Sequence, residues 1–177
     1  LWLLLLGSVC GYGQFSVLKN FTVNDGLPSS RIYDMLQDSI GHIWFATENG
    51  ISRFDGYEFR NYTTDDGLSS NSIVQIQLGK NNRIWIFLYE GGLYFFENDS
   101  IYKHWLTDSI KEKHVPFFMK MCDAGQGDYY LSPLTRGFVS FNENTQTFQY
   151  FHNSGNNNDK PQPITLFYTD DGEGNFI

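Results

Sequence analysis

The sequence is poor in cysteine, proline and charge, and each shortage excludes a class of protein. Among its 177 residues are two cysteines, too few for a disulfide framework. With 5 prolines and 17 glycines, it is neither collagen-like nor a proline-rich linker. Charged residues make up 18% and hydrophobic residues 41%, which is too apolar a balance for intrinsic disorder. A length of 177 residues predicts about one folded domain.

Basic residues are also scarce. The 12 Lys and Arg are outnumbered by 20 Asp and Glu, giving a net charge of −8 that repels phosphate backbones, so we expect no nucleic-acid partner. No His or Cys cluster has the spacing of a metal site, and we expect neither metal nor cofactor. The motifs G-x-G-x-x-G, G-x-S-x-G and H-E-x-x-H are missing, so we expect no catalytic residues and no enzyme in this segment.

The first 13 residues form an apolar leader. The run that opens with Leu1 and ends near Cys10 is too short for a bilayer, which takes about 20 apolar residues, and is typical of a signal peptide. Gly11 and Gly13 offer small residues for cleavage before Gln14. We therefore interpret 1–13 as a signal-peptide remnant and expect an exported, periplasmic protein. The alternatives are a buried strand and a lipoprotein modified at Cys10, which the bulky Val9 disfavours.

A repeat runs through residues 14–177. Asp-Gly-Leu-Pro-Ser at 25–29 recurs as Asp-Gly-Leu-Ser-Ser at 66–70, and Gly-His-Ile-Trp-Phe at 41–45 recurs as Asn-Arg-Ile-Trp-Ile at 82–86. Both recurrences lie 41 positions apart. A weaker third copy and the start of a fourth follow. We place the copies at about 21–62, 63–104, 105–151 and 162–177.

Each copy predicts four short antiparallel strands separated by Asx-Gly turns, as in a β-propeller blade. In the first copy we expect strands at 30–37, 42–47, 51–54 and 58–62. Aromatic residues make up 18% of the chain, and no stretch has a convincing helical period. The predicted fold class is all-β, an incomplete propeller of about three blades and part of a fourth.

One large ring recurs at the same position in each copy. Trp44, Trp85 and Tyr130 mark that position. We interpret these rings as core between neighbouring blades, because a ligand site is rarely repeated in every blade. The alternative is a set of stacking platforms for sugar rings.

The motifs resemble a known repeat. Asp-Gly-Leu-(Pro/Ser)-Ser, then Gly-x-Ile-Trp-Phe-x-Thr, then Gly-Ile-x-Arg-Phe-Asp-Gly is similar to the two-component regulator propeller repeat, closely over 24–62, well over 65–104 and in the second half of 105–151. The resemblance implies the periplasmic sensor of a bacterial receptor that detects glycan fragments. It also implies a parent sensor histidine kinase in the inner membrane, with a transmembrane helix and phosphorelay domains downstream, acting as a homodimer.

In a propeller, the loop before the innermost strand and the turn between the second and third strands share one face. Polar groups and tyrosines there suit hydroxyl-rich ligands such as an oligosaccharide. The expected ligand-binding residues on that face are Arg31, Glu48, Asn71, Tyr89, Glu90 and Arg136. The competing interpretation is that they are solvated turn residues. Two other functions stay open: a secreted propeller enzyme or carbohydrate-binding module acting on polysaccharide, and a purely structural interaction propeller.

Overall fold

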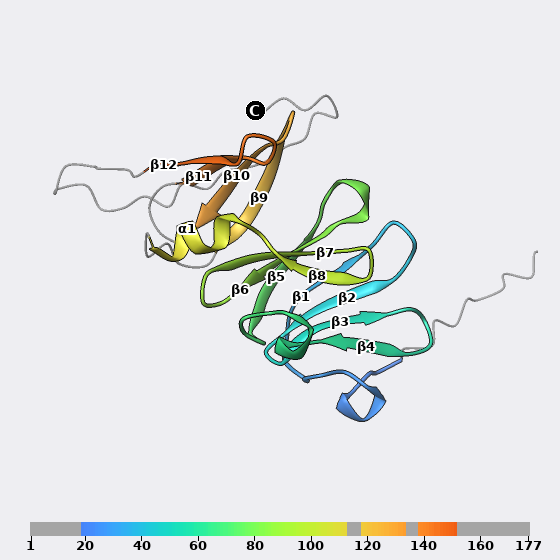
Figure 1. The fold of residues 1–177 in the computed structure, drawn as a ribbon. Helices are drawn as coiled ribbons and strands as arrows, with labels where there is room; N and C mark the ends of the chain where they lie inside the picture. Colours follow the sequence, from blue (N-terminus) through green and yellow to red (C-terminus); the bar gives the residue numbers. More distant parts are fainter. Residues whose placement is uncertain (1–18, 113–117, 134–137, 152–177) are drawn as a thin grey trace, which may run out of the picture.

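Three antiparallel sheets make up the described part of the protein (Figure 1). The structure is a computed structural model that describes residues 19–112, 118–133 and 138–151. The sheets are β1 (Ile32–Gln37), β2 (Ile43–Thr47), β3 (Gly50–Phe54) and β4 (Phe59–Tyr62); β5 (Ile73–Leu78), β6 (Ile84–Leu88), β7 (Gly92–Glu97) and β8 (Ser100–Lys103); and β9 (Phe118–Gly125), β10 (Asp128–Pro133), β11 (Phe138–Asn142) and β12 (Thr147–Phe151). Each sheet has four strands in sequence order. The predicted all-β class and the four-stranded antiparallel unit are confirmed.

One short helix was not expected. Helix α1 (Leu106–Glu112) follows β8, where the third copy has lost the Asp-Gly-Leu motif. Thr107 fastens it to the sheet, since its hydroxyl donates to the carbonyl of Leu93 at 2.6 Å and accepts from the Leu93 amide at 3.1 Å. No helical period is visible in the sequence here because the helix is too short to show one.

The Asp-Gly-Leu motif builds the same turn twice. Thr22 caps a 3₁₀ turn over Val23–Asp25 and Thr63 caps one over Thr64–Asp66; in both, the acid reaches back to the amide of the capping threonine. The following glycines, Gly26 and Gly67, have φ of 111° and 109°, a left-handed conformation that favours glycine. The leucine after each glycine is then buried.

The first two sheets enclose one apolar core. Trp44, Ala46, Ile51 and Tyr62 of the first sheet belong to the same buried cluster as Ile76, Ile84, Ile86, Tyr94 and Phe96 of the second. The Trp44 ring lies 4.7 Å from Phe96 and 6.1 Å from Tyr62, centroid to centroid. Trp44 is therefore almost fully buried between two blades, with 1% of its surface exposed.

The second and third sheets enclose another apolar core. Trp85, Phe87 and Leu93 cluster with Met121, Tyr129, Leu131, Val139 and Phe141 of the third sheet. Trp85 thus occupies in the second sheet the place that Trp44 has in the first: both lie on the face toward the next sheet.

Tyr130 has a different environment. Tyr129, its neighbour, points toward the second sheet and is buried, whereas Tyr130 is half-buried and its ring lies 5.9 Å from that of Phe138. Tyr130 pairs with Ser140 just as Trp44 pairs with Arg53, so its position in the sheet matches that of Trp44. It therefore lies on the face of the third sheet that turns away from the second.

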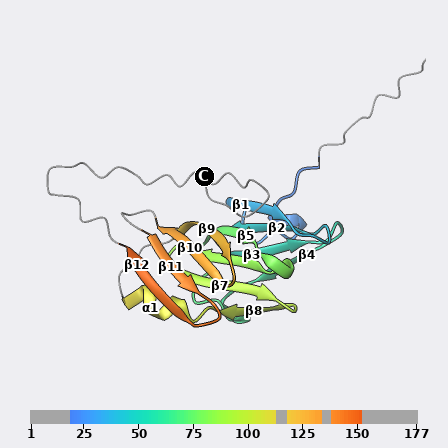
Figure 2. The ribbon, with the colours of Figure 1, turned by 90° about the horizontal axis from the view of Figure 1, so that it is seen from above.

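The first strands of the sheets lie near one another (Figure 2). Side chains join these strands across the blade boundaries. A carboxylate oxygen of Asp34 in β1 accepts the Ile76 amide of β5 at 3.0 Å. The side chain of Gln77 in β5 donates to the carbonyl of Met121 in β9 at 2.7 Å and accepts its amide at 3.2 Å. These bonds satisfy inner-strand backbone groups that no β-ladder reaches.

Candidate functional site

Arg31 and Glu48 meet at one end of the first sheet, as the expected loop face requires. Arg31 precedes β1, and Glu48 lies in the β2–β3 turn. The Arg31 guanidinium lies 2.9 Å from one carboxylate oxygen of Glu48, and the Ser29 hydroxyl donates to the other at 3.0 Å. A hydrogen bond with Tyr33 and the charge of Glu48 both raise the pKa of Arg31. Both side chains are open to solvent, so the pair presents a polar surface whose charges cancel.

Asn71 joins the two blades on the same face. Its backbone carbonyl accepts the Gly50 amide at 2.7 Å, and the carbonyl of the next residue, Ser72, accepts the Tyr89 amide at 3.0 Å. The β2–β3 turn of the first sheet and the β6–β7 turn of the second therefore flank one stretch of chain. The side-chain oxygen of Asn71 accepts the Thr64 amide at 2.8 Å, so this acceptor already has a partner within the fold.

Tyr89 and Glu90 form the tip of the β6–β7 turn, where both are exposed. Tyr89 is 59% exposed, the most open aromatic residue on this face among those described. Arg136 lies outside the described residues. We name the surface of Arg31, Glu48, Asn71, Tyr89 and Glu90 the loop face.

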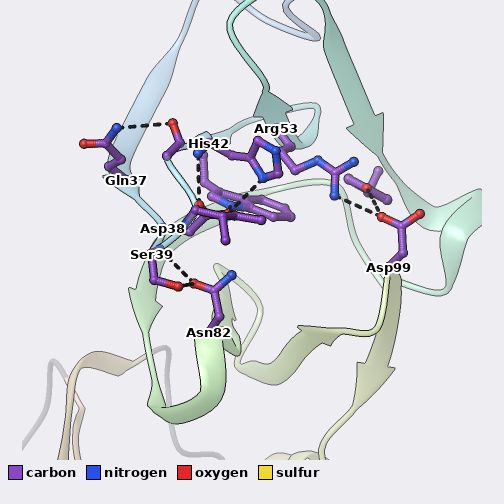
Figure 3. Close-up of polar contacts among 11 residues, drawn as sticks. Gln37, Asp38, Ser39, His42, Arg53, Asn82 and Asp99 are labelled. Carbon is purple, nitrogen blue, oxygen red and sulfur yellow. Dashed lines mark hydrogen bonds and ion pairs between the residues drawn. The ribbon is translucent and has the colours of Figure 1, made fainter.

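The opposite end of the sheets holds a cleft that the sequence interpretation missed. It has a volume of about 570 Å³ and lies between the first two sheets. The β1–β2, β5–β6 and β7–β8 turns surround it, and its lining includes Asp38, His42, Trp44, Arg53, Asn82 and Asp99. Figure 3 shows Asp38, His42, Arg53 and Asp99 converging there.

Asp38 is the buried polar centre of this cleft. Its carboxylate accepts the Trp44 indole N–H and the His42 amide, each at 2.9 Å, and the Ile40 amide at 3.1 Å. Burial alone raises the pKa of Asp38, but these hydrogen bonds outweigh it and the pKa lies below its usual value. An Asp stands six residues before Trp44, but Gly79 holds that place before Trp85, so the repeat did not mark this carboxylate.

Asp99 closes the rim of the cleft from the second sheet. Its carboxylate binds the guanidinium groups of Arg53, at 2.9 Å, and Arg60, and these contacts lower its pKa, with the bond from Arg60 contributing most. Next to it, the side-chain oxygen of Asn82 accepts the amide and hydroxyl of Ser39 at 2.9 and 2.7 Å (Figure 3). These polar groups pair across the blade boundary, so the cleft is in the first place a joint between two blades.

Metal-ligating side chains do not gather in the described part of the chain. Among those residues, no group of three or more His, Cys, Asp or Glu side chains could hold a metal ion. None of the helices described is long and apolar enough to cross a membrane. Cys122, the free cysteine described, is buried, which raises the pKa of its thiol above the usual value.

Sheets of four strands that stack face to face, each offering one large ring to the next, define an incomplete β-propeller. The sequence profile of the two component regulator propeller matches residues 26–49, which begin at the glycine of the first Asp-Gly-Leu motif and include β1 and β2. Residues 26–49 are thus similar to the repeat of that family, as the motifs indicated.

Comparison with known proteins extends the likeness. A histidine kinase of Formosa agariphila is 46% identical over 46 residues, which is 26% of this chain and 3% of the kinase. Two extracellular domains assigned to hybrid two component systems of B. thetaiotaomicron have the same fold. They superpose with TM-scores of 0.63 and 0.59 at 20% and 16% identity, covering 77% and 81% of this chain. The chain spans about a fifth of their length, 20% and 19%.

Proposed function

We propose that this chain is part of the periplasmic sensing region of a bacterial two-component receptor, and that its loop face binds a glycan fragment. The parent protein would be a sensor histidine kinase of the inner membrane that signals as a homodimer. The family profile, the kinase relative and the extracellular neighbours support the sensor role. They do not test the ligand, for which the argument comes from the loop face.

The observation that carries the ligand proposal is the convergence of two blades at Asn71 and Ser72. These residues hold the turn bearing Glu48 on one side and the turn bearing Tyr89 on the other. The exposed Arg31–Glu48 pair supplies donors and acceptors without net charge, and the Tyr89 ring supplies an apolar face. Neutral polyhydroxylated ligands need this combination, because hydrogen bonds orient them while a ring covers a sugar face.

Calorimetry of the receptor's extracellular region against a panel of neutral and acidic oligosaccharides tests the proposal. We expect Arg31→Ala and Tyr89→Ala to weaken binding at least tenfold, which corresponds to about 1.4 kcal/mol, with unchanged melting temperature. Arg60→Ala and Tyr57→Ala are matched controls. Arg60 binds Asp99 at the rim of the cleft, away from the loop face, and Tyr57 is an exposed aromatic residue in the β3–β4 turn. Equal effects in both sets, or no binding of any oligosaccharide, would overturn the ligand proposal.

The alternatives predict other outcomes. A propeller enzyme would turn over a polysaccharide, and a structural interaction propeller would bind neither oligosaccharide nor polysaccharide while retaining a protein partner. A ligand moves the receptor between its states only through its different affinities for them. Signalling in cells that is unchanged by Arg31→Ala and Tyr89→Ala would therefore place the sensing surface elsewhere in the receptor.

A further inference from the structure

The stretch before the first sheet repeats the outer strand of that sheet. Residues 19–22, Lys-Asn-Phe-Thr, match residues 60–63, Arg-Asn-Tyr-Thr, at the spacing of 41 that relates the two Asp-Gly-Leu motifs. Residues 60–62 lie in β4, the fourth and outermost strand of the first sheet. In sequence, then, the stretch that ends at Phe21 is the last strand of a blade that stands before the first.

Local contacts repeat as well. The ammonium of Lys19 lies 4.6 Å from the centroid of the Phe21 ring, and the guanidinium of Arg60 lies 5.1 Å from that of Tyr62. Thr22 and Thr63 then begin the two capped 3₁₀ turns described above. Both turns contact the outer strand of the sheet that follows them: Asn61 in β4 donates to the Gly26 carbonyl at 2.9 Å, and Gly67 approaches the carbonyl of Ile101 in β8.

Packing shows the same relation between neighbouring blades. Tyr62, at the end of β4, packs on Phe96 of the second sheet, with ring centroids 5.1 Å apart. Phe21 packs on Phe54 of the first sheet at 4.8 Å, and Phe54 is the counterpart of Phe96 at the end of the third strand. Phe21 therefore packs on the first sheet in the same way as Tyr62, at the end of β4, packs on the second sheet.

The face of the first sheet that bears Phe21 is covered only in part. Phe21 and Leu27 cover the outer strands through a small cluster with Phe45, Phe54 and Phe59. On β1, Tyr33 and Met35 stay 46% and 59% exposed, whereas Asp34 and Leu36, which face the second sheet, are half-buried. An outer strand is thus in place while the apolar inner part of the same face has no cover in the described structure.

We infer that this face docks a further blade of the same polypeptide, and that the stretch ending at Phe21 completes that blade as its fourth strand. The partner is a sheet with three strands of its own whose third strand has a free edge. The described strands of a second copy do not fit, because β3, β7 and β11 are each already paired on both sides. Strand addition supplies backbone hydrogen bonds along the edge, and closing a ring leaves no blade face open.

Hydrogen exchange tests this inference. It rests on the proposed function only in treating the chain as part of a longer receptor, and its readout needs no ligand. In an edge strand, consecutive amides point alternately to the partner and to solvent. In the whole extracellular region we therefore expect one of the amides of Asn20 and Phe21 to exchange at least about tenfold more slowly than in the 177-residue chain. Fast exchange of both amides in the whole region would overturn the inference.

Variants separate a closing strand from a local packing residue. Phe21→Ala in the whole extracellular region should speed exchange in a segment outside these 177 residues as well as near Phe54. Val23→Ala, an exposed position two residues further on, is the matched control. If Phe21→Ala affects only the first sheet, Phe21 is a local packing residue and the inference is wrong. Protection that appears in the 177-residue chain and grows with its concentration would point to a second copy instead, and would equally overturn it.

Discussion

The carboxylate of Asp38 accepts the indole N–H of Trp44 at 2.9 Å, six residues further along the chain. The same carboxylate closes the β1–β2 turn through two backbone amides. In the second blade the corresponding residue is Gly79, where a Cβ would lie 2.6 Å from the indole nitrogen of Trp85. One structural position is therefore filled by a carboxylate in the first blade and kept empty in the second.

We expect Asp38→Asn to lower the free energy of unfolding by about 1–3 kcal/mol, because a neutral amide cannot replace a carboxylate that accepts all these bonds. Urea denaturation measures the change. Asp65→Asn, in the exposed turn before β5, is the control and should change stability by less than about 0.5 kcal/mol. Equal losses for the two variants would contradict the role given to Asp38.

Trp44→Ala and Trp85→Ala should each cost about 3–5 kcal/mol of stability, since each removes a large ring from a core between two sheets. A lower melting temperature or soluble yield is the expected readout. Tyr57→Ala, at a ring that is 94% exposed, should leave both unchanged. Wild-type stability together with lost ligand affinity would support the sugar platforms that we rejected.

Acid should weaken the joint between the second and third blades through His104. Burial, together with the nearby charge of Arg83, lowers the pKa of His104 to about 4, and its Nδ1 accepts the Leu106 amide at 3.2 Å. Because its pKa is lower in the folded than in the unfolded state, the unfolded chain binds the proton more readily. Stability should fall by up to about 3 kcal/mol as the pH drops from about 6.5 to 4.

The free energy of unfolding measured across that range checks this expectation. His104→Phe should flatten the slope between about pH 6.5 and 4, since it removes the titrating group. The carboxylate of Asp38 acts in a separate window, because its pKa is lowered and its contribution is lost only below its ordinary value of 3.8. An unchanged slope in His104→Phe would assign the acid sensitivity to other groups.

Two of the inter-blade ion-pair sites should differ in strength. Arg83 binds Glu97 of its own blade and Glu143 of the third, and all three side chains are largely enclosed. Asp99 binds Arg53 and Arg60 in a more open position. Arg83→Met should cost about 1–3 kcal/mol, whereas Asp99→Asn should cost less than about 1 kcal/mol.

Salt separates the two sites further. The effect of Asp99→Asn should vanish near 1 M salt, where exposed charges are screened over about 3 Å, while that of Arg83→Met should persist. Denaturation of both variants at low and high salt gives the comparison. If high salt removes the stability losses of both variants alike, the Arg83 ion pairs are screened by solvent as exposed pairs are, and the difference assigned to their burial is wrong.

Much of the fold could be predicted from the sequence because the same pattern of strands and turns recurs in successive copies of the repeat. The strands expected at 42–47 and 51–54 match β2 and β3 within one residue. Turn formation or capping was the role expected of Asp25 and Asp66, and each takes part in the cap of a 3₁₀ turn with the threonine three residues before it. Helix α1 was missed because it is a single departure from the repeat.

The candidate site was less accessible from the sequence. Strand order alone places Arg31 and Glu48 at one end of a blade, and their ion pair fits that placement. The cleft depends on Asp99 reaching Arg53 across a blade boundary, a contact between residues 46 positions apart that no local pattern encodes.

The sequence by itself determined the four-stranded unit, its turns and the repeated large ring, because hydrophobic alternation and glycine placement act over a few residues. Only the tertiary structure decided which face of each sheet is covered and which polar groups meet. Trp44 and Tyr130 hold equivalent places in their sheets, yet one is buried and the other half-buried. The physical reason is that burial belongs to the pair of packed sheets, and a strand's own residues do not specify its neighbour.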